Sequence, residues 1–104
     1  MRLSLLKIGE IKPEMQNIDV EGWVVEKGEK KEVMTRYGPA MVSWAILKDE
    51  TGSIRVNLWR WQIDIVQVGD RIRLVNAFVK VFGERMELNI GANGKIVVLN
   101  RSKK

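Results

Sequence analysis

The sequence predicts an all-β protein, a five-stranded barrel with one short helix between the third and fourth strands. Two observations carry this prediction: short segments rich in valine and isoleucine are separated by turn residues, and apolar and polar residues alternate clearly over residues 53–59. The 104 residues contain no internal repeat and are too few for two separate cores. We therefore expect one domain over residues 1–104, with its core in about 6–99 and a basic tail at 100–104.

The first strand is expected over about residues 18–27. Gly22 lies inside it, and because glycine weakens a strand, it indicates a sharp bend or a close approach of another backbone. A charged segment, residues 28–39, predicts a long hairpin excursion. The second strand then follows over about residues 40–48.

The third strand, residues 53–59, begins after an Asp-Glu-Thr-Gly turn at residues 49–52. One of its faces is aliphatic and is expected to lie in the core, whereas the other is basic, polar and aromatic. The core face carries Ile54, Val56 and Leu58, and the outer face carries Arg55, Asn57 and Trp59.

A short helix is expected within residues 61–68, before a fourth strand over residues 71–82. The alternation of this strand slips by one residue near Asn76, as it does at a β-bulge. Beyond the slip, the outward residues are Phe78, Lys80 and Phe82.

A tight hairpin at residues 82–85 leads to the fifth strand, residues 86–90. Residues 91–94, with two glycines, are expected to break this strand, and residues 96–99 add a final short segment. Five strands, a bend in the first and a helix after the third are typical of the OB fold. A small SH3-like barrel is the alternative architecture.

The composition excludes several kinds of chemistry. Cysteine and histidine are absent, so disulfides, thiolate nucleophiles, ordinary zinc sites and the commonest general base are excluded. Asp49 and Glu50 are explained better by turn hydrogen bonds than by catalysis or metal binding. We expect no catalytic residue, no metal and no cofactor, and hence no enzyme.

Targeting signals are also not expected. No apolar segment approaches the roughly 20 residues that a membrane span needs, and residues 1–7 do not resemble a signal peptide. We therefore expect a cytoplasmic protein without membrane partners, associated with the nucleoid.

The distribution of charge favours a polyanionic ligand. The net charge is +5, and three of the cations belong to the tail. Residues 51–63 and 71–83 contain only basic charges, whereas acidic residues gather in the first strand and the loop after it. We expect a basic groove across the third and fourth strands.

Aromatic residues on the same outer faces indicate stacking with unpaired bases, although single aromatic residues in small barrels are often part of the core. Trp44 could be core, platform edge or interface. Cations of the first hairpin could close over a strand or form a solvated charged surface. The candidate stacking residues are Trp59, Phe78, Phe82 and Trp44, and the candidate polar or phosphate contacts are Arg55, Asn57, Arg60, Arg73, Lys80, Arg85, Lys30, Lys31 and Arg36.

Five short motifs are spread along the chain between Leu6 and Leu99: Ile8-x-x-Ile-Lys-Pro13, Asp49-Glu-Thr-Gly52, Leu58-Trp59, Val68-Gly-Asp-Arg-Ile72 and Asn76-Ala-Phe78. In these motifs the chain resembles archaeal single-stranded-DNA-binding proteins and replication protein A OB domains. The resemblance implies an OB fold with DNA lying across the second, third and fourth strands. It also implies a platform of three aromatic residues, whose positions match Trp59, Phe78 and Phe82.

The expected function is sequence-tolerant binding of single-stranded DNA in replication, recombination or repair, with other replication or repair proteins as partners. One alternative is an OB subunit that assembles a replication protein A-like complex through Trp23, Trp44 or Trp61. The other is an OB domain that binds RNA, because stacking serves both nucleic acids.

Overall fold

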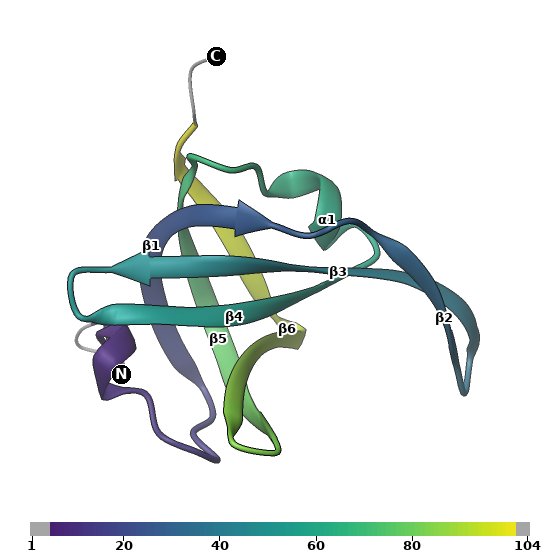
Figure 1. The fold of residues 1–104 in the computed structure, drawn as a ribbon, viewed down its shortest axis with the longest axis horizontal. Coiled ribbons are helices and arrows are strands. Elements are labelled where there is room, and N and C mark those ends of the chain that lie inside the picture. The colour runs from purple at the N-terminus through teal and green to yellow at the C-terminus, as the bar shows by residue number, and fades with distance from the viewer. Residues whose placement is uncertain (1–4, 102–104) are drawn as a thin grey trace.

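The computed structural model describes residues 5–101, in which β-strands dominate (Figure 1). The elements in chain order are η1 (Ile8–Glu10), β1 (Ile18–Lys27), β2 (Lys31–Thr35), β3 (Gly38–Asp49), β4 (Gly52–Trp59), α1 (Gln62–Ile65), β5 (Arg71–Phe82) and β6 (Arg85–Asn100). The all-β prediction with a short helix after the third predicted strand is confirmed. The five predicted strands correspond to β1, β3, β4, β5 and β6, and β2 is additional.

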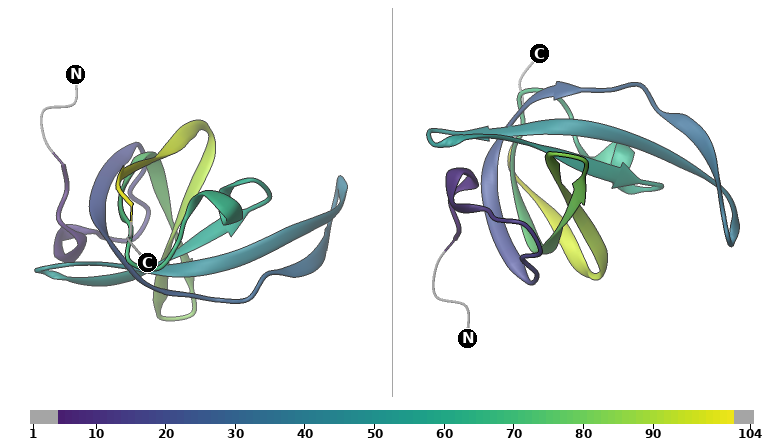
Figure 2. Two further views of the ribbon diagram at one scale, coloured as in Figure 1. Left: turned by 90° about the horizontal axis from the view of Figure 1, so that it is seen from above. Right: turned by 60° about the horizontal axis from the view of Figure 1, so that its bottom comes forward.

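The strands form one sheet in the order β1-β5-β6-β4-β3-β2, and β1 also pairs with β3. The sheet therefore closes in a ring around the core (Figure 1). Neighbouring strands are antiparallel except β4 and β6, which are parallel. The predicted excursion is the β2–β3 hairpin, which projects beyond the ring (Figure 2).

Two irregularities expected from the sequence are confirmed. A Cβ atom at Gly22 would lie 2.7 Å from the carbonyl oxygen of Lys48 and 2.9 Å from Cγ of Leu47, so glycine is needed where β1 crosses β3. In β5 the pairing shifts at Asn76, whose φ of 62° is left-handed. This bulge moves the inward positions of β5 by one residue.

The predicted break at residues 91–94 is wrong as a strand end, because β6 continues through it. These residues nevertheless leave the ladder with β5: Ala77 pairs with Ile90, and Val75 pairs with Lys95. Four residues of β6 thus oppose the single residue Asn76, and the excess bends the strand.

The helix is also shorter than predicted. α1 ends at Ile65, and the next residue, Val66, is already extended and fully buried. The Nζ of Lys27 donates hydrogen bonds of 2.6 Å to the carbonyl oxygen of Ile63 and 2.7 Å to that of Val66. A side chain from β1 therefore satisfies carbonyl groups that a longer helix would have paired within itself.

The core is aliphatic. Valine, isoleucine, leucine and alanine side chains from the five strands of the ring, from η1 and from α1 fill it. Aromatic residues usually contribute strongly to protein cores. In this chain all seven lie outside the buried cluster: Trp23, Tyr37, Trp44, Trp59, Trp61, Phe78 and Phe82.

Parts of two predictions concern residues outside the described range: residues 1–4 of the segment that does not resemble a signal peptide, and residues 102–104 of the basic tail. Asn100, expected in the tail, belongs to β6. Within residues 5–101 no helix has the length and apolar character of a membrane span, and no cluster of acidic side chains has a metal-binding arrangement.

Candidate nucleic-acid interface

One outer face of the ring combines β3 and β4 with the first half of β6 and the second half of β5. The expected groove across the third and fourth predicted strands requires a correction, because β6 runs between β4 and β5. We call this surface the platform face. Its outward side chains are Trp44, Arg55, Asn57, Trp59, Phe78, Lys80, Phe82, Arg85, Glu87 and Asn89.

Strand register arranges these side chains in rows. Trp44 of β3 pairs with Asn57 of β4, and Phe78 of β5 pairs with Asn89 of β6. The Nδ2 of Asn57 donates to Oδ1 of Asn89 at 3.4 Å and so joins the two pairs. A row with aromatic ends and an amide middle therefore crosses four strands.

The neighbouring row is charged. Glu87 of β6 lies between Arg55 of β4 and Lys80 of β5 in the two registers. Glu87 accepts hydrogen bonds from Nε of Arg85 at 2.8 Å and from Nδ2 of Asn57 at 2.9 Å. The Nε of Arg55 lies 3.8 Å from the same carboxylate. One buried acid thus holds two arginines and an amide together.

The four candidate stacking residues are all at the surface. Trp44, Trp59 and Phe78 are half-buried, so part of each ring is accessible. Phe82 is 65% exposed and lies at the end of β5, next to the hairpin turn. None of these four rings belongs to the buried core cluster.

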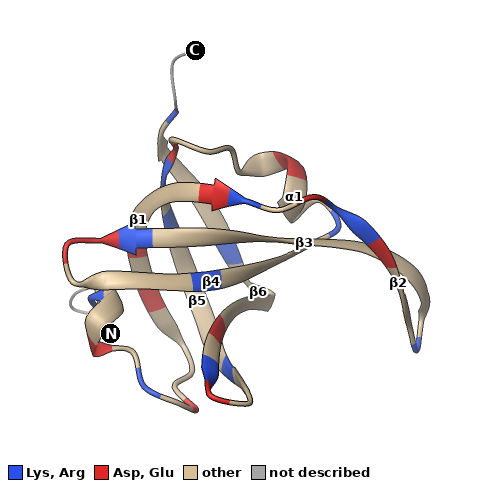
Figure 3. Cartoon of the chain, in the orientation of Figure 1, with Lys and Arg blue, Asp and Glu red and all other residues tan. Residues whose placement is uncertain are grey.

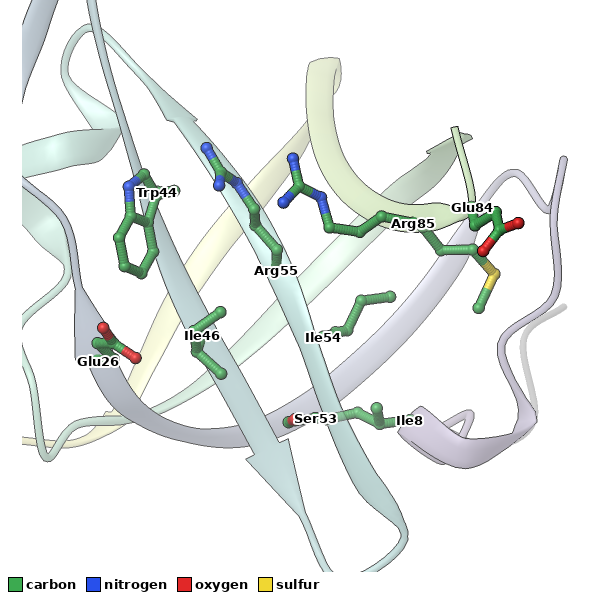
Figure 4. Close-up of a pocket in the computed structure, with 10 residues that line it drawn as sticks. Ile8, Glu26, Trp44, Ile46, Ser53, Ile54, Arg55, Glu84 and Arg85 are labelled. Carbon is green, nitrogen blue, oxygen red and sulfur yellow. The ribbon is translucent and has the colours of Figure 1, made fainter. Parts of the chain in front are cut away.

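Trp44 is part of the platform face and not of the core. The guanidinium of Arg55 lies over its ring, 5.2 Å from the centroid, which is a cation–π distance. Trp44, Arg55 and Arg85 line a groove of about 480 Å³, with Glu26 and Glu84 at its opposite ends (Figure 4). A second groove, of about 380 Å³, continues from Trp44 and Arg55 toward Lys31 of the hairpin.

Other predicted contacts lie near one end of this face. Arg60 and Trp59 line a depression of about 320 Å³ beside the bend of β6. Lys30 faces a different hollow, which it shares with Arg60 and Trp61. Arg36 lies in the turn of the β2–β3 hairpin. This hairpin projects away from the ring (Figure 3).

The structure does not bring Arg73 to the platform face. Arg73 lies on the half of β5 that precedes the bulge, where it pairs with Glu21 of β1. Its Nε donates to Glu21 at 2.7 Å, and Nη2 of Arg71 donates to the same carboxylate at 3.0 Å. Burial alone would raise the pKa of Glu21, but the hydrogen bonds from Arg73 and Arg71 outweigh it and lower the pKa.

Glu87 and Asn89 were not among the predicted site residues. Their alternation with Leu88 and Ile90 was a signal that they face outward. Their position between β4 and β5 depends on the parallel β4–β6 pairing, which joins segments about 30 residues apart and has no local sequence signature. Asn89 Nδ2 has no hydrogen-bond partner within the described part of the chain.

Comparison with known proteins identifies relatives of the whole fold. The chain is 32% identical over 90 residues to "Single-stranded DNA binding protein Ssb" of Saccharolobus solfataricus, covering 86% of this chain and 61% of that protein. It is 29% identical over 96 residues to "Replication factor A" of Methanothermobacter thermautotrophicus, covering 91% of this chain and 12% of that protein. The chain therefore spans less than two thirds of either relative.

Among solved structures, the second OB-fold domain of replication protein A from Methanococcus maripaludis superposes with a TM-score of 0.78 at 28% identity. The match covers 97% of this chain and all of that domain. The family described as "Single-stranded DNA binding protein Ssb-like, OB fold" matches residues 14–98, which include every residue of the platform face. The chain belongs to this Ssb-like OB-fold family.

Proposed function

We propose that this chain binds single-stranded DNA with little regard to base sequence and acts in DNA replication, recombination or repair. Bases stack on Trp59, Phe78, Phe82 and Trp44, and phosphates contact the cations around them. The relatives, a single-stranded-DNA-binding protein and a replication factor A, support the ligand class. The activity is binding without a chemical reaction, and we expect it at the nucleoid, where unpaired strands are exposed.

The observation that carries this proposal is the separation of aromatic residues from the core. Aliphatic side chains fill the interior, so stability does not require the rings to be buried. Four of the seven rings instead share one outer face with Arg55, Arg85 and Lys80. Exposed rings beside cations are the combination by which proteins hold unpaired bases and their phosphates.

Titration of a labelled dT oligomer, followed by fluorescence anisotropy at several salt concentrations, tests the proposal. We expect affinity to fall with salt, with a slope of about −0.7 for each phosphate contacted. Trp59→Ala should weaken binding by about 1–3 kcal/mol, the usual value for one stacked base. Unchanged affinity in this variant would refute the stacking assignment.

Trp23→Ala is the matched control. Trp23 is 45% exposed, but it lies on β1, and the guanidinium of Arg71 covers its ring at 4.4 Å. We expect this variant to bind dT as tightly as the parent chain. Competition with RNA of matched length and base sequence separates DNA binding from the RNA alternative, because the 2′-hydroxyl group is what lets a protein distinguish RNA from DNA.

A second candidate function is assembly with other subunits of a replication protein A-like complex. The projecting hairpin favours it, because Met34 and Tyr37 are strongly exposed there, and Trp61 is exposed near its base. Sedimentation at micromolar concentration, with and without dT, tests this function. Stable oligomers that do not bind DNA would favour assembly over strand binding.

A further inference from the structure

Glu87 is an acid at the centre of a face that otherwise carries cations. Only 3% of the residue is exposed, and its register neighbours are Arg55 on one side and Lys80 on the other. A site built only to attract phosphate would not have a carboxylate at this position, because the negative charge repels the ligand. The acid therefore calls for a functional explanation beyond strand attraction.

The contacts of Glu87 leave the phosphate-binding ends of both arginines free. Arg85 reaches the carboxylate through Nε at 2.8 Å, and Arg55 approaches it through Nε at 3.8 Å. Among the described residues, the terminal nitrogens of these two arginines donate no hydrogen bond to an acid. Both line the groove of Figure 4, with guanidinium groups at its rim.

The floor beside Glu87 is polar but uncharged. The amides of Asn57 and Asn89 form the middle of the row next to Glu87, and the buried Nδ2 of Asn89 lacks an acceptor within residues 5–101. An uncharged base can lie beside these neutral amides, whereas a phosphate at this place would lie close to the Glu87 carboxylate. Coulomb repulsion is strongest at short range and where water is excluded.

We propose that Glu87 determines how a strand lies on the platform face: it reserves the centre for an uncharged base and keeps phosphates at the arginine rim. This inference rests on the proposed function, since it concerns the orientation of the same ligand. Glu87 is thus a specificity-determining residue that favours strands with bases over bare polyanions.

The test compares a dT oligomer with an abasic deoxyribose-phosphate oligomer of the same length. In the parent chain we expect dT to bind much more tightly. Glu87→Gln should bind the abasic oligomer about tenfold more tightly than the parent does, the size expected from one charge at short range. Its salt slope for that oligomer should steepen by about 0.7, since one more phosphate is neutralised. The preference for dT should therefore fall about tenfold.

Glu14→Gln is the matched control, because Glu14 is an exposed acid that precedes β1, outside the platform face, and the substitution changes the net charge equally. We expect its preference for dT to equal that of the parent. If Glu14→Gln and Glu87→Gln lose preference equally, net charge explains the effect and the inference is wrong. Equal losses of affinity for both oligomers in Glu87→Gln would show a merely structural role and also overturn it.

Circular dichroism and thermal unfolding establish whether Glu87→Gln is folded. Should it not fold, the double variant Arg85→Gln/Glu87→Gln removes donor and acceptor together and keeps the net charge, with Arg85→Gln alone as its reference. The double variant should again have the lower preference for dT, and equal preferences would refute the inference. A parent chain that does not bind dT refutes the proposed function itself, whereas binding with no effect of Glu87 refutes only this inference.

Discussion

Replacing Gly28 by alanine tests whether the position of Trp44 matters for binding. A Cβ atom at Gly28 would lie 2.2 Å from Nε1 and 2.3 Å from Cε2 of the Trp44 indole. Non-bonded atoms pack at about 3.5–4.0 Å, so the ring has to move by about 1 Å or more. The backbone cannot easily yield, because Gly28 N–H donates to the Trp44 carbonyl at 2.9 Å and Ser43 Oγ donates to the Gly28 carbonyl at 2.7 Å.

The expected effect on affinity follows from the displacement. One stacked base contributes about 1–3 kcal/mol, and a ring that is moved but not deleted should lose the lower part of this range, about 1 kcal/mol or roughly fivefold in Kd. The ring also leaves its place under the Arg55 guanidinium. Overpacking should lower the free energy of unfolding by about 1–3 kcal/mol, measured by urea denaturation.

Gly91→Ala provides the control, because the added methyl would meet only Cε1 of Phe78, at an ordinary distance of 3.4 Å. Anisotropy titrations with dT should show parental affinity for this variant. Trp44→Ala should weaken binding at least as much as Gly28→Ala, and the double variant should lose no more than Trp44→Ala, since both changes act on one ring. Additive losses, or unchanged affinity in Gly28→Ala, would refute the reasoning.

Three further predictions concern stability and the exposed ring. Burial alone would raise the pKa of Asp49, but hydrogen bonds, first from the Ile8 N–H, outweigh it and lower the pKa below 3.8. The charged carboxylate therefore stabilises the fold above pH 3.8, and this contribution is lost as the pH falls through the folded-state pKa. Asp49→Asn should lower the free energy of unfolding by about 1–3 kcal/mol at pH 7 and weaken its dependence on pH below 4 in urea titrations, whereas an unchanged acid profile would contradict this. Gly22→Ala should lower the thermal midpoint, because its methyl would overlap Leu47 and a backbone oxygen, and a parental midpoint would show that β1 can move away. Phe82→Ala should weaken dT binding while leaving the thermal midpoint unchanged, since its ring is mostly exposed, and loss of stability without loss of binding would assign the ring to packing.

The local alternation of apolar and polar residues was sufficient to predict several features of the fold. Strict alternation over residues 53–59 predicted which side chains of β4 face outward, and the slip near Asn76 predicted the bulge of β5. Both features depend on the two-residue period of a strand, which neighbouring residues alone express. Outward placement of Trp59, Phe78 and Phe82 followed from the same period.

Features that depend on contacts between distant segments could not be predicted. The path of β6 through residues 91–94 depends on the bulge of β5. The early end of α1 depends on Lys27 of β1, which donates to two carbonyl groups there. Arginine commonly contacts phosphates, so Arg73 was a reasonable candidate. In the structure, however, Glu21 on the neighbouring strand β1 holds the Arg73 side chain away from the platform face.

The sequence by itself therefore determined an all-β chain whose aromatic and basic residues share the outer side of its strands, because alternation and composition are local properties. Only the tertiary structure decided that β6 separates β4 from β5 and brings Glu87 and Asn89 to the middle of the platform face. The physical reason is that the parallel pairing of β4 with β6 joins segments far apart in the sequence. Its free energy comes from closing the ring, and no periodic pattern along the chain indicates it.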